Sequence, residues 1–153
     1  MAASSRRQAI VSFALERLGG IQVADGYATD AGSLVFAGAV PVLGPDDPAV
    51  ALAVVLGTDE TAWQGEHVEL RLPIRISALA KGVSVDAWLA VEAVVGDIKR
   101  ALETADRTWG KLVMWQILRG STETFPQEPG SGQVGATVTY TAHYKERWGH
   151  PEL

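Results

Sequence analysis

Residues 134–144 read Val-Gly-Ala-Thr-Val-Thr-Tyr-Thr-Ala-His-Tyr, and their alternation decides the fold class of the chain. Every second residue from Val134 to Tyr144 is apolar or aromatic, whereas the residues between them are glycine, threonine and histidine. Successive side chains of a strand point to opposite faces. This stretch therefore predicts a strand with one face on a core and a row of threonines on the other.

Two other stretches predict strands of the same sheet. Residues 49–56 are apolar at every position and rich in valine, which is typical of a strand buried on both faces. Residues 67–77 alternate between apolar and polar side chains. Pro73 lies in this second strand and has no N–H, so we expect it at an edge, at a bulge or beyond the paired part of the ladder. Residues 111–119 are a fourth candidate, and 34–42 is the extended piece of a mixed region rich in glycine.

Two helices complete the pattern. Ser4 and Ser5 can cap a helix over residues 6–18, and Ser84 can cap a second that ends at 106–110. Trp88 and the apolar residues that follow it at steps of three and four form the stripe of the second helix. The order of elements predicts an α+β fold. It has a single, mainly antiparallel sheet of four to five strands, with two helices packed on one face.

The 153 residues predict one domain over 1–153. Residues 120–132 are rich in Gly, Ser, Thr, Pro and Glu and predict a mobile surface loop, and residues 146–153 predict a polar tail. With helices on one side of the sheet only, the second face of the 49–56 strand needs cover from a long loop or another subunit.

Composition excludes several classes of function. The chain has no cysteine, which rules out disulfides, thiolate metal sites and cysteine nucleophiles. Its formal net charge of -5 argues against a broad nucleic-acid-binding surface, because phosphate contacts need clustered Lys and Arg. No apolar run reaches the roughly 20 residues that span a bilayer, so we expect folding in a cytoplasm and no membrane partner.

No motif for chemistry is found. His67, His143 and His150 lack the spacing of a zinc site, and Asp46-Asp47 between prolines and glycine is typical of a turn. Neither a nucleophile elbow nor a phosphate-binding glycine loop occurs. We therefore predict no catalytic, metal-binding or cofactor-binding residues, and no enzymatic activity.

The tryptophans divide into two groups. Trp88 belongs to the helix stripe, and Trp115 alternates with Val113 and Ile117, so both are predicted to be buried. Trp63 and Trp148 lie outside the core pattern. They either cover an edge of the core or anchor a contact with another protein, since tryptophan is enriched at interfaces.

Several local phrases, in this order, carry a family resemblance. They are Gly26-Tyr27-Ala28-Thr29-Asp30-Ala31-Gly32, Pro48-Ala49-Val50, Gly57-Thr58-Asp59-Glu60, Leu72-Pro73-Ile74, Thr108-Trp109-Gly110 and Gly135-Ala136-Thr137-Val138-Thr139-Tyr140. Together with the layout of helices and strands, they resemble the tail terminator (tail completion, minor tail) proteins of long-tailed bacteriophages. The resemblance spans most of the chain. This family has no catalytic signature, so no active-site residue is implied.

The resemblance implies a virion subunit at the head-proximal end of a tail, assembled in the cytoplasm of a host bacterium. Copies would form a ring, usually a hexamer, that stops polymerisation of the tail tube and offers the head-joining surface. The implied partners are further copies, the tail tube protein and a head–tail connector or neck protein, and DNA would pass through without specific binding. By position, we expect contacts from the 26–44, 57–66 and 120–132 stretches and the tail. The candidate interface residues are Tyr27, Asp30, Trp63, Glu66, Thr124, Phe125 and Trp148.

Two alternatives stay open. One is another phage component of similar size, such as a neck or tube-initiator protein. The other is a small ligand-binding or enzymatic α+β domain with a pocket between sheet and helices. Such a pocket needs convergent polar groups on the core-facing side, and the predicted core stripes are almost purely apolar.

Overall fold

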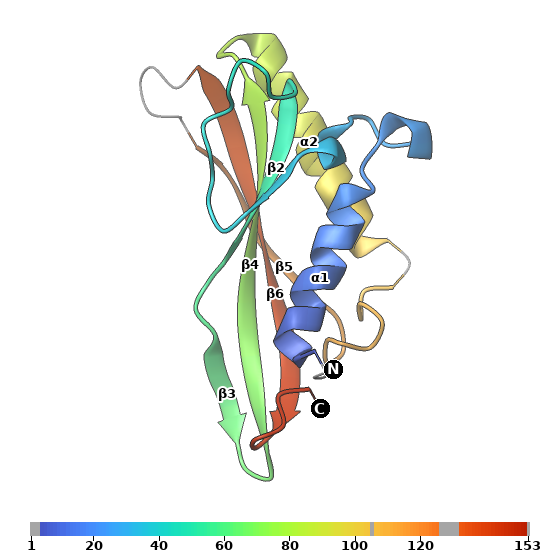
Figure 1. The fold of residues 1–153 in the computed structure, drawn as a ribbon, viewed down its shortest axis with the longest axis vertical. Coiled ribbons are helices and arrows are strands. Elements are labelled where there is room, and N and C mark those ends of the chain that lie inside the picture. Colours follow the sequence, from blue (N-terminus) through green and yellow to red (C-terminus); the bar gives the residue numbers. More distant parts are fainter. Residues whose placement is uncertain (1–3, 105, 126–131, 153) are drawn as a thin grey trace.

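The computed structural model describes residues 4–104, 106–125 and 132–152. A long, twisted sheet carries both α-helices on one face (Figure 1). The elements in chain order are α1 Arg6–Gly19, β1 Val35–Ala37, β2 Val50–Leu56, β3 Glu60–Gln64, β4 His67–Lys81, α2 Val85–Glu103, β5 Leu118–Phe125 and β6 Gln133–Arg147, with short 3-10 turns at Val23–Asp25 and Ala31–Ser33. The predicted α+β class is confirmed, but the described sheet has six strands instead of four to five.

Two 15-residue strands, β4 and β6, form the spine of the molecule. They pair antiparallel along their whole length, from His67 opposite Arg147 to Lys81 opposite Gln133. The alternation places Ile76 and Val138 on the helix side and Ser77 and Thr137 on the other. The strands predicted at 67–77 and 134–144 are therefore correct and extend further than predicted.

The sheet order is β1-β2-β4-β6-β5, and β3 pairs with β4 beside β2. Only β1 is parallel to its neighbour. β2 and β3 pair with successive parts of the same edge of β4, and Pro73 lies between the two parts. Pro73 pairs with Thr141 on the β6 side, so the expectation that it lies outside the ladder is wrong there. On the opposite side its carbonyl accepts from the Gly57 amide at 2.8 Å, where β2 ends.

Both helices begin at a capping serine, as predicted. The Ser5 hydroxyl accepts from the Gln8 amide and the Ser84 hydroxyl accepts from the Ala87 amide. The helices bury their apolar stripes against β4 and β6, and Trp88 lies half-buried at the margin of this core. The largest fully buried side chains are Trp109, Tyr140, Tyr144, Ile10, Leu18, Ile21, Leu52, Leu72, Ile74, Ile76, Leu79 and Ile98.

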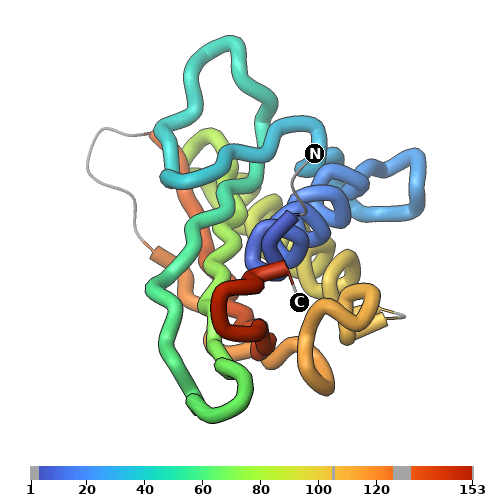
Figure 2. The backbone as a smooth tube through the Cα atoms, turned by 60° about the horizontal axis from the view of Figure 1, so that its bottom comes forward, coloured from blue at the N-terminus to red at the C-terminus, as the bar shows by residue number. Residues whose placement is uncertain are grey.

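The second face of β2 is covered by a long loop, one of the two possibilities predicted for it. Ala51 and Ala53 point away from the helices and are fully buried. The side chain of Gln133 accepts from the Leu43 amide at 2.6 Å and donates to the Pro41 carbonyl at 2.9 Å. These two bonds hold the 38–49 segment to β6. Figure 2 shows this segment leaving the sheet and returning to β2.

The strand predicted at 111–119 is wrong. Residues 107–115 form turns, in which Trp109, Lys111 and Trp115 have positive φ angles of 50°, 65° and 60°. A strand cannot contain these left-handed residues. Trp115 is 72% exposed, which corrects its predicted burial, and Trp109 is the buried tryptophan of this segment. The Trp109 indole donates to the Leu102 carbonyl at 3.1 Å.

Two predicted connections also contain strands. β3 occupies most of the segment predicted as a polar connection at 57–65. β5 begins at Leu118 and includes residues 120–125 of the predicted surface loop, whereas 126–131 lie outside the described residues. The chain end folds back on the start of α1, where the Arg6 amide donates to the Pro151 carbonyl at 2.7 Å.

Candidate interaction surfaces

Trp63, Glu66 and Trp148 come together at the end of the β3–β4 hairpin, which projects beyond both helices (Figure 1). Trp63 is 46% exposed and its ring centroid lies 4.8 Å from that of His67. Trp148 is 57% exposed, and its indole N–H donates to the Gly65 carbonyl at 2.8 Å. The Trp63 ring lies directly over Gly65, where an added Cβ would be 2.1 Å from the ring. Two large aromatic side chains are thus held at an exposed end.

A charged groove of about 500 Å³ runs beside this hairpin end. Its lining residues are Arg6, Glu66, His67, Lys145, Glu146 and Arg147. One Arg6 guanidinium nitrogen donates to the Lys111 carbonyl at 3.3 Å, and its Nε is buried without a partner among the described residues. Charges of both signs line the groove, so it is suited to polar contacts with a protein surface.

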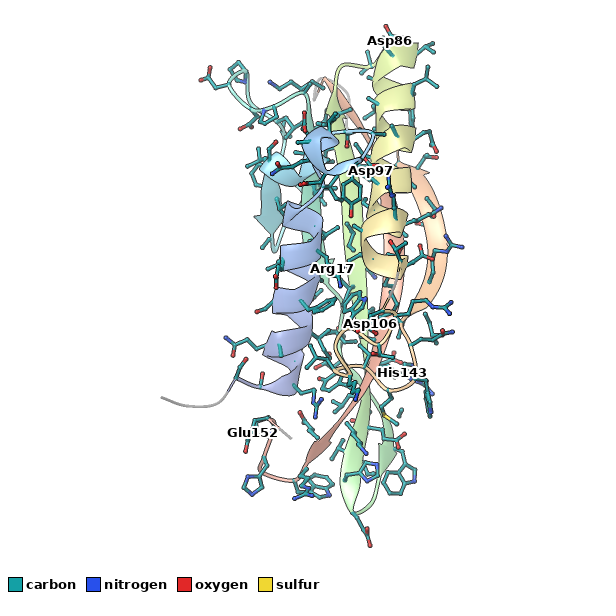
Figure 3. All side chains as sticks on the ribbon, turned by 90° about the vertical axis from the view of Figure 1, so that its right-hand side faces the viewer. Arg17, Asp86, Asp97, Asp106, His143 and Glu152 are labelled. Carbon is teal, nitrogen blue, oxygen red and sulfur yellow. The ribbon has the colours of Figure 1, made fainter. Side chains whose placement is uncertain are left out.

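Tyr27 and Asp30 lie on a loop that α2 holds in place. The buried carboxylate of Asp97 accepts from the Ala28 amide at 3.0 Å and from the Thr29 amide at 2.8 Å. It also accepts from the Thr29 hydroxyl at 2.7 Å. The Arg100 guanidinium stacks 5.1 Å from the centroid of the Tyr27 ring. This loop therefore presents its side chains in a fixed arrangement, and Figure 3 shows Asp97 pointing toward it.

Thr124 and Phe125 end strand β5, at the opposite end of the sheet from the tryptophans (Figure 1). Thr124 is exposed, whereas Phe125 is half-buried. The Phe125 ring lies on Gly135, where an added Cβ would be 2.3 Å from it. Phe125 thus packs within the chain and Thr124 faces outward.

The seven candidate residues fall into three separate surfaces: the hairpin end, the loop on α2 and the end of β5. Asp97 was not among them, although it fixes the position of two of them. An acidic residue on an amphipathic helix usually faces solvent, and nothing near Asp97 in the sequence marks its partner loop.

The phenols of the core are structural acids. The Tyr140 hydroxyl donates to Glu103 at 2.8 Å, and burial together with this bond raises the Tyr140 pKa far above its ordinary value. The Tyr144 hydroxyl donates to Asp59 at 3.1 Å, and burial and the Asp59 charge raise the Tyr144 pKa in the same direction. Both groups stay protonated at neutral pH, so neither is a ready proton acceptor.

His143 lies on the sheet face away from the helices. Burial and the neighbouring Arg71 lower its pKa from the ordinary value, against a smaller opposing effect of Glu69. Within the described ranges, no three His, Asp or Glu side chains gather as metal ligands do. No described helix is both long and apolar enough to span a membrane.

No family model matches the sequence, and neither does any curated protein. Among solved structures, the chain is similar to a chain of a structure described as "Virion of native gene transfer agent (GTA) particle". The two share 16% sequence identity with a TM-score of 0.58. The match covers 87% of this chain and 92% of the other. At this identity, the likeness shows a common fold over nearly the whole of both chains.

Proposed function

We propose that this chain is a structural, non-enzymatic subunit of a phage-like virion, and that it forms the ring that terminates a tail tube. Copies would close into a ring, expected to be a hexamer, at the head-proximal end of the tail. The ring would stop polymerisation of the tube and offer the surface to which the head joins. DNA would pass through it without specific contacts, in keeping with the net charge of -5.

The likeness in fold to a virion chain, over 87% of this chain, is the observation that carries the proposal. The phrases that resemble tail terminators, among them Leu72-Pro73-Ile74, point the same way and add the position in the tail. The surfaces are compatible with assembly, because three of them present aromatic or polar side chains at separated places. A subunit within a stack of rings needs contacts along the tail axis as well as around it.

Within this proposal, the hairpin end with Trp63, Glu66 and Trp148 is the surface for the tube or the neck. Tryptophans on a projecting element are suited to such a contact, since aromatic anchors dominate interface energies. Tyr27, Asp30 and Thr124 lie higher on the molecule and are assigned to contacts between neighbouring copies.

Deleting the gene from the virion-producing genome tests the proposal, with electron microscopy of the particles as the readout. Loss of a terminator leaves the tube free to grow, so we expect tails of irregular excess length without heads. Supplying the wild-type chain should restore tails of uniform length.

The same experiment separates the alternatives. A tube initiator would leave no tails at all, and a neck protein would leave headless tails of normal length. Either result would replace the terminator proposal with the corresponding one.

A further inference from the structure

The sheet has two open edges that face opposite ways. β1 and β5 are the first and last strands in the order β1-β2-β4-β6-β5, so each presents one unpaired side. Figure 3 shows β5 on one side of the molecule and the β1–β2 edge on the other. Such an edge is a template for another strand, and natural proteins usually block it with proline, lysine or a covering element. β5 is eight residues long and contains neither proline nor lysine.

Both edges lie at the same level of the sheet. Val35 pairs with Leu52, and the register continues through Ala78 and Ala136 to Thr124. Two residues further along, Ala37 is connected through Val54, Ile76 and Val138 to Thr122 in the same way. β1 and β5 run in opposite directions, because β1 is parallel to β2 and the three following pairings are antiparallel.

The backbone groups at these positions point outward. In β1, the Leu34 carbonyl and the Gly38 amide bond to β2, so the alternating residues Val35 and Ala37 face away from it. In β4, the Pro73 carbonyl bonds toward Gly57, which assigns the outward side by alternation across β6. Thr122 and Thr124 then direct their amides and carbonyls away from β6.

An apolar groove of about 230 Å³ lies where β1 stops. Its lining residues are Val11, Leu15, Ala37, Gly38, Val54, Val55 and Leu56. β2 continues to Leu56 without a β1 partner, because the paired residues of β1 end at Ala37. A strand longer than β1, added at this edge, would cover the groove.

From these observations, we infer that copies of this chain join through their sheets, β5 of one copy adding antiparallel to β1 of the next. Thr122 and Thr124 would lie opposite Ala37 and Val35, and the first residues of β5 would cover the groove beyond Ala37. The two edges differ, so the contact is head-to-tail, the kind that closes into rings. The inference rests on the proposed ring, because it names the edges through which that ring would close.

A disulfide test suits this chain, which has no cysteine. The double variant Ala37→Cys/Thr122→Cys places one thiol on each edge at exposed positions. Within one copy the two are four strand spacings apart, or about 19 Å, whereas a disulfide needs Cα atoms within about 7 Å. Under mild oxidation, we expect a ladder of covalent oligomers on a non-reducing gel, ending at the size of the closed ring.

The matched control is Ala37→Cys/Glu123→Cys. A shift of one residue turns the thiol to the opposite face of the strand, so this variant should give no ladder. A second pair of variants tests the backbone bonds. Thr124→Pro removes an outward amide and should abolish assembly, whereas Thr124→Val keeps that amide and should assemble as the wild type. Thermal melting verifies that both are folded.

Each outcome decides a different statement. Rings seen by negative-stain microscopy without the 37–122 cross-link would overturn the edge pairing and leave the proposed ring standing. A cross-linked ladder from open filaments, with no closed rings, would support the pairing and overturn the ring. Dimers from Thr122→Cys alone would show that β5 pairs with itself, which also overturns the inference. Neither rings nor cross-links would overturn both.

Discussion

Replacing Asp97 with alanine should release the 22–30 loop from α2. The Asp97 carboxylate accepts three hydrogen bonds from Ala28 and Thr29, at 2.7 to 3.0 Å, and is itself only 4% exposed. A hydrogen bond to a charged group contributes about 1.5–3 kcal/mol. Ala28 is exposed, so its freed amide can bind water and the loss falls at the lower end for each bond. We expect the free energy of unfolding to fall by about 2–4 kcal/mol in total.

Calorimetry measures this change directly. For a chain of this length, 1 kcal/mol shifts the melting temperature by about 2–4 °C, so Asp97→Ala should melt about 5–15 °C below the wild type. The amides of Ala28 and Thr29 should also lose protection in hydrogen exchange, while the β4 and β6 amides keep theirs.

Two further variants sharpen the result. Glu92→Ala, on the exposed side of the same helix, should stay within about 0.5 kcal/mol of the wild type. Asp97→Asn keeps one carbonyl acceptor and should fall between the two. If Asp97→Ala melted with the wild type and kept its loop protected, the loop would be held by contacts other than this carboxylate, and the reasoning would be refuted.

Three other predictions concern the sheet and the hairpin end. Val138→Asp buries a charge on the helix side of β6 and should unfold the domain or make it insoluble, whereas Thr139→Asp on the opposite face should stay folded; circular dichroism and sedimentation distinguish them. Because burial and the neighbouring Arg71 lower the folded-state pKa of His143, the unfolded chain binds more protons below about pH 6.5, so stability should fall as the pH decreases through this range. His143→Gln should flatten that slope in urea unfolding at several pH values, and an unchanged slope would assign it to other groups. Trp148→Ala removes one bond at an exposed site, so it should shift stability by at most about 1 kcal/mol yet reduce head joining; full infectivity of this variant would refute a contact role for the hairpin end.

Hydrophobic alternation predicted the parts of the fold that have a buried side. β4 and β6 bury one face against the helices, and the period of two is visible over both. β3 and β5 have mainly exposed residues on both faces, so no alternation marks them. Their strand conformation comes from hydrogen bonds to β4 and β6, which are remote in sequence. The glycine, serine and threonine of β5 therefore suggested a loop.

The false strand at 111–119 shows the opposite error. Val113 and Ile117 are buried as the alternation predicts, but turns bring them to the core. The Met114 amide donates to the His143 carbonyl at 2.7 Å, and the Ile117 amide donates to the Arg107 carbonyl at 2.9 Å. Tertiary contacts thus hold backbone conformations that the local pattern does not predict. The candidate surfaces were located by similar signals, and their grouping into three places depends on register.

Pro73 explains why the hairpin end projects. Its missing N–H faces the side on which β2 lies, so the β2–β4 ladder cannot gain a full hydrogen-bonded pair at this level. Gly57 passes close to the proline ring, where an added Cβ would be 2.9 Å from Pro73 Cβ, and the chain leaves the ladder here. It returns as β3 at Glu60, opposite Arg71. A single strand, β4, thus supports two partners on one edge, and the second extends past the helices. The proline that seemed unsuited to a central strand divides the sheet into a helix-covered part and an exposed arm that carries both tryptophans.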